Sequence, residues 1–279
     1  MESLVSTDWL AAELGAADLR ILDATWFLPG SGRDARAEYE AGHISGAAFV
    51  DIDAVSDPDS PFPHMLPPAH LMASRMQALG VSDGTRIVVY DNSPLHSAAR
   101  VWWMLRAFGA KRVALLDGGL AKWIAEGRPL ESGAAAGGRG HFTPALREEA
   151  VASKDEVRAL IGGDTQIVDA RGAARFAGEE AEPRPGLAAG HMPGAKNLPQ
   201  GQLFNEDGTW KRGDALRAEF ERAGIDLSRP MVTTCGSGVT AAVLLFGAHL
   251  LGKEDVRLYD GSWSEWGADP ATPKAKGRT

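Results

Sequence analysis

Short apolar runs alternate along this chain with longer segments in which apolar residues recur at helical spacing. Runs rich in Ile, Val and Leu that are bounded by polar or turn residues are typical of buried strands, and longer Ala- and Leu-rich segments are typical of helices. The expected strands are 20–24, 86–90, 112–116, 166–170, 231–234 and 256–259, and the expected principal helices are 97–108 and 239–250.

Strands that are separated by helical segments predict a specific architecture. Parallel neighbours need crossover connections, so alternating elements indicate a mostly parallel sheet with helices on both faces. We therefore expect an α/β fold. Ligands of such sheets bind outside the carboxyl ends of the strands, which directs the search for a site to residues that follow a strand.

The chain also contains two loosely similar halves. ILDA at 21–24 recurs as IVDA at 167–170, GHISGA at 42–47 as GHMPGA at 190–195, and LDGGL at 116–120 as YDGSW at 259–263. The repeat distance of 143 to 148 residues is too long for a solenoid, whose period is roughly 20–50 residues. We predict two tandem domains, 1–131 and 151–279, joined by a Gly-rich linker at 132–150.

The most reactive residue type occurs once, at Cys235, between the expected strand 231–234 and the expected helix 239–250. In the run CGSGVT (235–240), two glycines allow the backbone to curl and to direct several N–H groups at one point. Together with the positive end of a helix dipole, such a loop binds anions and favours a thiolate. One cysteine excludes an internal disulfide and a multi-thiolate metal site, so we predict a nucleophile that passes its load to an outside acceptor.

The first half has lost this nucleophile. Its run DNSPLH (91–96) aligns with CGSGVT, so Asp91 stands at the position of Cys235. Pro94 also removes one backbone donor from the loop. We expect the first domain to be catalytically inactive.

Tandem α/β domains with one loop cysteine in the second half resemble the rhodanese superfamily over nearly the whole chain. The run CGSGVT resembles the loop of its 3-mercaptopyruvate sulfurtransferase branch, whereas thiosulfate-preferring members have basic residues at positions 236 and 237. Further similar segments are FVDID (49–53), SPFPHML (60–66), RVWWM (100–104) and EPR (182–184).

The resemblance implies a sulfurtransferase mechanism without a metal or an organic cofactor. Cys235 attacks the sulfur of 3-mercaptopyruvate, pyruvate leaves, and Gly236, Gly238, Val239 and Thr240 surround the resulting persulfide. A thiol acceptor such as thioredoxin or a small thiol, or cyanide in vitro, then takes the outer sulfur.

The family also pairs a loop serine with a histidine and an aspartate from the first domain, which correspond here to Ser237, His64 and Asp53. Neither His64 nor Asp53 has an evident equivalent in the second half, and a feature that occurs once in a duplicated chain with one active site is better explained by function than by fold. We expect the three to move a proton during catalysis.

Two arginines are the candidates for the substrate carboxylate. Arg175 and Arg184 resemble family arginines that line the site, and a guanidinium matches a carboxylate with two hydrogen bonds. Acidic neighbours such as Glu182 leave open that both are ordinary solvated arginines. Arg171, next to a strand end, is a weaker third candidate.

Other conspicuous residues are expected to be structural. His43 and His191 occur in the repeated Gly-His-x-x-Gly-Ala motif of both halves, although only one half has the cysteine, so we expect each to tie a loop to the sheet. The same applies to a set of tryptophans expected in the core: Trp102, Trp103, Trp123, Trp263 and Trp266.

Composition limits the remaining possibilities. The chain has 279 residues and a formal net charge of −8, which gives no support for nucleic-acid binding. No stretch approaches the ~18 apolar residues of a membrane span, and the first residues lack the pattern of a signal peptide. We expect a cytoplasmic protein that acts on a small molecule.

Three alternatives remain at this stage. The first is a thiosulfate sulfurtransferase on the same fold, although CGSGVT contains no cation for a dianionic donor. The second is a related phosphatase of the Cys-x5-Arg type, but Ala241 stands where that arginine would be. The third is a non-catalytic persulfide carrier loaded by a partner protein.

Overall fold

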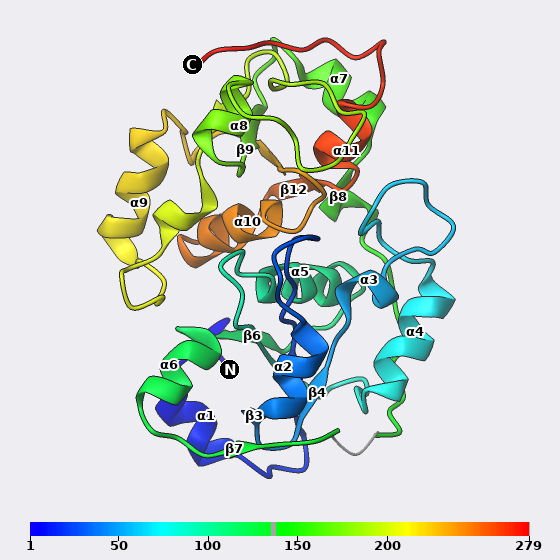
Figure 1. The fold of residues 1–279 in the computed structure, drawn as a ribbon, viewed down its shortest axis with the longest axis vertical. Coiled ribbons are helices and arrows are strands. Elements are labelled where there is room, and N and C mark those ends of the chain that lie inside the picture. The colour runs from blue at the N-terminus through cyan, green and yellow to red at the C-terminus, as the bar shows by residue number, and fades with distance from the viewer. Residues whose placement is uncertain (135–137, 279) are drawn as a thin grey trace. The chain divides into compact units, whose positions relative to one another are not determined.

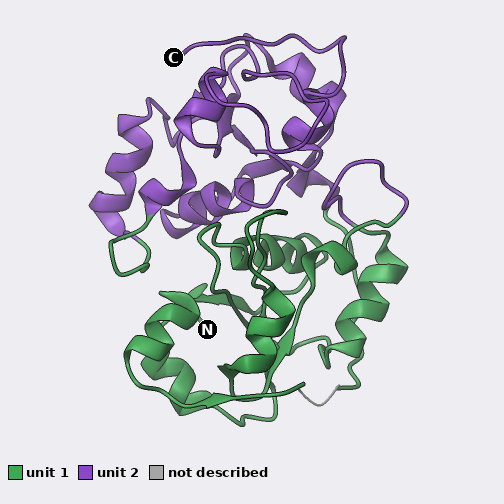
Figure 2. Cartoon of the chain, viewed as in Figure 1, with its two compact units in different colours: residues 1–58, 67–147, 204–210 green, residues 59–66, 148–203, 211–279 purple. Residues whose placement is uncertain are grey.

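The computed structural model describes residues 1–134 and 138–278 (Figure 1). Residues 135–137, which fall in the predicted linker, lie outside the described residues. The chain forms two compact units, which Figure 2 shows in separate colours. Unit 1 comprises residues 1–58, 67–147 and 204–210, and unit 2 comprises residues 59–66, 148–203 and 211–279.

The described strands and helices of unit 1 follow one another in a largely alternating order. The strands are β1 (Leu4–Val5), β2 (Leu19–Asp23), β3 (His43–Ile44), β4 (Ala47–Phe49), β5 (Arg86–Tyr90), β6 (Val113–Leu116) and β7 (Leu130–Glu131). The helices are α1 (Thr7–Glu13), α2 (Ala35–Ala41), α3 (Ile52–Val55), α4 (Ala69–Ala78), α5 (Ala98–Ala107) and α6 (Gly119–Ala125).

Unit 2 repeats this alternation with fewer strands among its described residues. The strands are β8 (Val151–Ala152), β9 (Gln166–Asp169), β10 (Lys196–Asn197), β11 (Met231–Thr234) and β12 (Val256–Tyr259). The helices are α7 (Lys154–Leu160), α8 (Ala173–Ala177), α9 (Gly213–Arg222), α10 (Ala241–Leu250) and α11 (Ser262–Trp266), with 3-10 turns η1 (Glu148–Ala150) and η2 (Gln200–Leu203).

The two central sheets have the same topology. Within the described residues, the sheet of unit 1 has the strand order β1-β6-β5-β2-β4, and the sheet of unit 2 has the order β8-β12-β11-β9-β10. All strand pairs in both sheets are parallel. Because equivalent strands occupy equivalent places, the repeated sequence motifs correspond to a duplicated α/β fold with parallel sheets, as predicted.

The predicted elements are confirmed with small shifts at their ends. The runs 86–90, 231–234 and 256–259 coincide with β5, β11 and β12. The helix expected over 239–250 begins later, at Ala241, with Thr240 as its N-cap residue.

The continuous domain boundaries predicted from the sequence do not anticipate one feature of the fold. Residues 59–66 group with unit 2, although the sequence on both sides of them belongs to unit 1. Residues 204–210 group with unit 1 in the same way. Each half of the sequence therefore contributes a short segment to the unit that the other half mainly forms.

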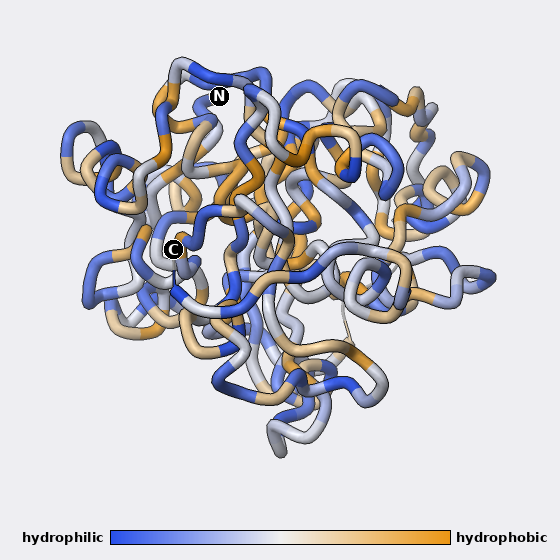
Figure 3. The backbone as a smooth tube through the Cα atoms, turned by 90° about the horizontal axis from the view of Figure 1, so that it is seen from above, coloured by the Kyte–Doolittle hydropathy of each residue, from blue (hydrophilic) through white to orange (hydrophobic). Residues whose placement is uncertain are grey.

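Each unit has its own hydrophobic core. One core includes Ile21, Val88 and Trp123, and the other includes Val232, Trp263 and Trp266. Figure 3 shows hydrophobic backbone segments concentrated in the interior and many hydrophilic loops at the rim. The five tryptophans expected in the core are each at most 2% exposed, so that prediction is confirmed.

Candidate active site

Cys235 directly follows β11 and is 2% exposed. The loop from Gly236 to Thr240 then leads into α10, whose first N–H groups have no acceptor within the helix. The sequence therefore places a thiol at the carboxyl end of a central strand and at the amino end of a ten-residue helix. This position combines a rigid support with a concentration of backbone N–H donors.

The segment 260–264, which follows β12 and includes the start of α11, holds the cysteine loop in place. We call this segment the turn after β12. The Cys235 N–H donates to Ser262 Oγ at 3.2 Å, and the Trp263 N–H donates to the Cys235 carbonyl at 3.0 Å. Ser264 donates to the Gly236 carbonyl through its N–H at 2.8 Å and its hydroxyl at 2.7 Å. Sequence reasoning did not identify these anchors, although the repeated YDGSW motif was a signal for this turn.

His64 and Ser237 are in hydrogen-bonding contact. His64 Nδ1 lies 2.8 Å from Ser237 Oγ, and both residues belong to unit 2. Their exposed fractions are 3% and 5%, so the contact is shielded from water. His64 has a positive φ of 64°, an uncommon conformation for a residue with a side chain, which indicates that the surrounding structure holds it in place.

Asp53 lies in a different setting. It is an exposed residue of α3 in unit 1, and its carboxylate accepts a hydrogen bond from Trp26 Nε1 at 3.0 Å. Its part in the proton-transfer group stays a prediction that rests on the family resemblance.

Arg175 is next to the cysteine loop. A side chain at position 236 would place its Cβ 3.1 Å from Arg175 Nη2, so the absence of a side chain at Gly236 lets the guanidinium approach the loop. The same Nη2 donates to Glu182 Oε2 at 2.5 Å. Among the described residues, Arg175 Nε is buried without a hydrogen-bond partner, which leaves a donor for a ligand oxygen.

Glu182 is a structural residue of the site that sequence reasoning treated only as an acidic neighbour. Its side chain is 2% exposed and accepts from both Arg175 and Arg171. Arg171 also pairs with Asp169 and stacks its guanidinium 4.4 Å from the centre of the Trp263 ring. Burial disfavours the charged form of Arg171, but the two carboxylates outweigh it and raise its pKa, so Arg171 is committed to structure.

Arg184 is partly exposed, in the segment between α8 and β10. Its contact with a substrate carboxylate stays a prediction.

The two repeated histidines are structural, as predicted. His43 Nδ1 lies 2.8 Å from the Tyr39 carbonyl, and its ring stacks on Tyr39. His191 Nδ1 lies 2.9 Å from the Phe176 carbonyl, and its ring stacks on Phe176. The same pairing in both units shows that it belongs to the fold and not to the cysteine.

The loop of unit 1 that corresponds to the cysteine loop binds its own side chain. The Asp91 carboxylate accepts the Ser93 N–H at 3.0 Å and the Ala98 N–H at 2.7 Å. Burial raises the pKa of Asp91 to about 7, although these two hydrogen bonds act in the opposite direction. The Asp91 carboxyl group thus binds two backbone N–H groups of the loop and helix start that correspond to the cysteine loop and α10 of unit 2.

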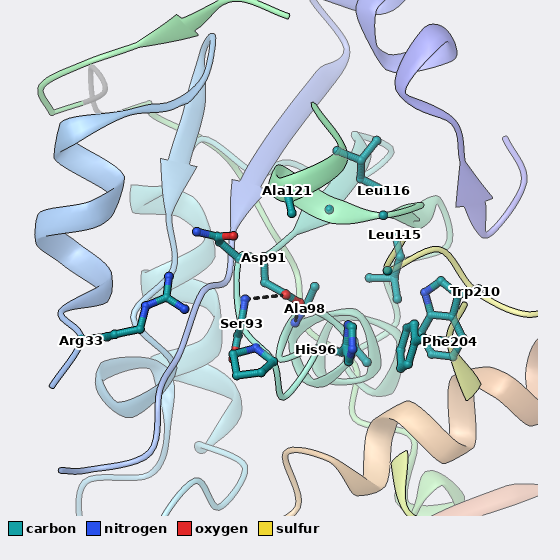
Figure 4. A pocket seen from close by; sticks show the side chains of 16 residues that line it. Arg33, Asp91, Ser93, His96, Ala98, Leu115, Leu116, Ala121, Phe204 and Trp210 are labelled. Carbon is teal, nitrogen blue, oxygen red and sulfur yellow. Dashed lines mark hydrogen bonds between the residues drawn. The ribbon is translucent and has the colours of Figure 1, made fainter. Parts of the chain in front are cut away.

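A pocket of about 320 Å³ lies beside this loop within unit 1 (Figure 4). Its wall includes the stacked rings of His96 and Phe204, with centroids 3.4 Å apart, and Trp210 beside them. Phe204 and Trp210 come from the segment 204–210, the counterpart of the segment that carries His64. In unit 1 this segment thus makes an aromatic contact with the loop, whereas in unit 2 the segment 59–66 makes a polar contact through His64.

In the part of the chain that the structure describes, no helix is long and apolar enough to cross a membrane. The same residues contain no group of three or more His, Cys, Asp or Glu arranged to hold a metal ion.

Comparisons with known proteins agree on one family. The rhodanese-like domain family matches residues 6–126 and 153–269. The 3-mercaptopyruvate sulfurtransferase of Escherichia coli strain K12 is 46% identical over 271 residues, which cover 96% of each chain. The Homo sapiens enzyme of the same name is 46% identical over 271 residues, covering 95% of this chain and 91% of the relative.

Comparison with solved structures finds a similar protein. A crystal structure from Escherichia coli, described as a 3-mercaptopyruvate sulfotransferase with the rhodanese fold, aligns with a TM-score of 0.86 and 43% sequence identity. The alignment covers 94% of this chain and 99% of that one. Sequence and structure thus point to relatives of the same kind over almost their entire length.

Proposed function

The chain belongs to the rhodanese family, and we propose that it is a 3-mercaptopyruvate sulfurtransferase that works through a persulfide on Cys235. The observation that carries this proposal is a buried cysteine at the start of an uncharged loop, two residues before a serine in contact with a histidine. The relatives that share this chain's length and name this activity support the same assignment.

The first half-reaction breaks a carbon–sulfur bond. The Cys235 thiolate attacks the substrate sulfur, a sulfur–sulfur bond forms, and the electron pair of the carbon–sulfur bond leaves with pyruvate as its enolate. One proton converts the enolate to pyruvate. The enzyme keeps the substrate sulfur, with its hydrogen, as a persulfide.

In the second half-reaction the persulfide is the donor. An acceptor thiolate attacks the outer sulfur, which leaves with it, and Cys235 returns to a thiolate. Because the chain has no second cysteine, the acceptor is an outside group. We propose a small thiol or the thiol of a protein such as thioredoxin, with cyanide as a substitute in vitro.

Ser237 and His64 have the role of proton transfer in this proposal. The serine hydroxyl lies two residues from the nucleophile, and the 2.8 Å contact lets the imidazole exchange a proton with it. Asp53 is proposed as the third member, to orient the histidine. General acid–base catalysis of this kind contributes roughly 10²–10⁴-fold to a rate.

Substrate binding is assigned to cations outside the loop and to donors within it. Arg175 is held beside Gly236 by Glu182, and its buried Nε supports a contact with the substrate carboxylate. Arg184 is the proposed second contact. The N–H groups of Gly236, Gly238, Val239 and Thr240 are proposed to surround the sulfur that is transferred.

We further propose that the domain formed by the first half is catalytically inactive, because Asp91 stands in place of the cysteine and Pro94 removes a backbone donor from its loop. The proposed domain limits are those of the sequence, 1–131 and 151–279 with a linker at 132–150. The cytoplasm is the proposed location, since a persulfide relay needs thiol acceptors that a reducing compartment keeps available.

One assay tests the proposed function. Purified protein is incubated with 3-mercaptopyruvate and 2-mercaptoethanol, and pyruvate is measured through lactate dehydrogenase; thiosulfate with cyanide is assayed in parallel. We expect kcat/KM to be higher with 3-mercaptopyruvate. A higher value with thiosulfate would make the protein a thiosulfate sulfurtransferase, and no turnover of either donor would indicate a persulfide carrier.

A further inference from the structure

The turn after β12 contacts both the cysteine loop and the segment 59–66, which carries His64. Ser262 and Trp263 in this turn bind the backbone of Cys235. Asp260, two residues earlier, accepts the Leu66 N–H on its Oδ2 at 2.7 Å. Leu66 belongs to the segment 59–66 that carries His64, and all of these residues are part of unit 2.

The segment around His64 has few backbone N–H groups that could form hydrogen bonds with the rest of unit 2. Residues 61, 63, 67 and 68 are prolines, which have no N–H to donate. His64 itself adopts a left-handed conformation that is unfavourable for a residue other than glycine. The Leu66 N–H is therefore one of the few backbone donors available, and its acceptor is a carboxylate that is 2% exposed.

An equivalent contact is present in unit 1. Asp117 follows β6 as Asp260 follows β12, in the paired motifs LDGGL and YDGSW. In unit 1, Asp117 Oδ1 accepts the Trp210 N–H at 2.9 Å, and Trp210 belongs to the segment 204–210. In each unit, the aspartate at this equivalent position thus binds the segment supplied by the other half of the sequence.

Only one of the two equivalent contacts leads to a reactive group. In unit 1, the bound segment ends in aromatic packing against His96. In unit 2, the bound segment presents His64 to Ser237. We propose that Asp260 is a positioning residue for catalysis: by holding the Leu66 N–H it fixes the strained backbone at His64, so that the imidazole stays in contact with Ser237.

This inference rests on the proposed function. It means that the turn after β12 holds both the cysteine loop and the segment that carries His64. If the Asp260 contact is lost, the cysteine loop keeps its hydrogen bonds to Ser262 and Trp263, so sulfur can still reach Cys235. What is lost is the alignment of His64. The expected defect is therefore in kcat and not in substrate binding.

The test compares Asp260→Ala, Asp260→Asn and the matched control Asp117→Ala, which removes the equivalent contact in unit 1. We expect Asp260→Ala to lower kcat for pyruvate release by about 10–100-fold with KM changed less than about threefold. Asp260→Asn keeps an acceptor oxygen and should restore most of the rate. Asp117→Ala should lower the melting temperature about as much as Asp260→Ala while kcat stays near that of the wild type.

A double-mutant cycle separates positioning from general destabilisation. If Asp260 acts through His64, adding Asp260→Ala to His64→Asn should lower kcat no further. Two independent factors that multiply, or wild-type kcat in Asp260→Ala, would overturn the inference.

A measurement on the wild type covers the cases in which a variant does not fold or 3-mercaptopyruvate is not the donor. Amide hydrogen exchange followed by NMR should show a strongly protected Leu66 N–H, and in Asp260→Asn the His64 ring signals should keep their wild-type positions. A Leu66 amide that exchanges as fast as an exposed loop would contradict the inference whatever the donor. Absence of pyruvate release by the wild type, with Leu66 protected, would contradict the proposed function alone.

Discussion

His64 Nδ1 lies 2.8 Å from Ser237 Oγ, although 173 positions separate the two residues in the sequence. The contact is buried and lies two residues beyond the only cysteine of the chain. It therefore links the nucleophile's loop to an imidazole, a side chain that can donate or accept a proton.

The first prediction concerns this contact. Replacing His64 by Asn, which tolerates a positive φ better than Ala, should lower kcat about 10²-fold because proton transfer to the leaving enolate is lost. KM should change little. The measurement is steady-state pyruvate release with a thermal melt as the check on folding, and His70→Ala, at an exposed histidine of α4, is the control. Unchanged kcat in His64→Asn would remove the histidine from the mechanism.

The second prediction concerns substrate binding and the lack of a side chain at position 236. Gly236→Ala would bring a Cβ within 3.1 Å of Arg175 Nη2 and displace the guanidinium, so KM for 3-mercaptopyruvate should rise by about threefold to tenfold. Gly201→Ala, where nothing lies within 4 Å, is the matched control. A KM equal to the wild-type value would separate Arg175 from substrate binding.

The third prediction concerns donor choice and the charge of the cysteine loop. Gly236→Arg combined with Ser237→Lys should shift the ratio of kcat/KM toward thiosulfate, because the loop would then offer cations to the second anionic end of that donor. The ratio is measured with both donors on the same preparation. A ratio that stays constant while both activities fall would show that loop charge does not select the donor.

The fourth prediction concerns Arg184. Arg184→Ala should raise KM by roughly 10–100-fold, equivalent to about 1.5–3 kcal/mol for a charge-assisted hydrogen bond, and leave kcat nearly unchanged. Initial-rate kinetics over a wide substrate range separate the two constants. If kcat falls and KM does not, the arginine acts on the transition state and not on uniform binding.

Much of the fold follows from local patterns in the sequence. The apolar runs that became β5, β11 and β12 are short, bounded and rich in β-branched residues, and the repeated motifs fix which strands correspond. Cys235 could be recognised for the same reason, since strand, glycine loop and helix are adjacent in the chain. Local physics decides these features.

The remaining features depend on contacts between distant residues. Glu182 looked like a solvated acid, but its burial between Arg171 and Arg175 depends on the folding of a long connection. The exchanged segments 59–66 and 204–210 carry no periodic pattern that would reveal their destination. The role predicted for His64 rests on the family resemblance and on the lack of an equivalent in the second half, because no local rule connects a Pro-rich loop to Ser237.

A fifth prediction uses pH to test the packing of unit 1. Burial against Phe204 lowers the pKa of His96 to about 4, whereas an unfolded histidine titrates near 6.5. The unfolded chain therefore binds a proton below about pH 6.5 that the folded chain takes up only near pH 4. His96 contributes its full stability above that range and loses it as the pH falls, by up to ~3 kcal/mol.

His96→Asn removes the titrating imidazole, and asparagine tolerates the positive φ of 49° at this position. Urea unfolding at several pH values between 7 and 4 should show a flatter decline in the free energy of unfolding for the variant than for the wild type. Parallel curves would show that His96 titrates normally in the folded protein.

The central claim is that one sulfur atom resides on Cys235 between the two half-reactions, and mass spectrometry of the intact protein tests it directly. After 3-mercaptopyruvate is added without an acceptor, the wild type should gain the mass of one sulfur atom, lose it when a thiol is added, and release one pyruvate for each sulfur bound. Cys235→Ser should show neither the added mass nor pyruvate release, and Asp91→Cys introduced into that variant should not restore them. Sulfur loading or pyruvate release that persists in Cys235→Ser would contradict the persulfide mechanism.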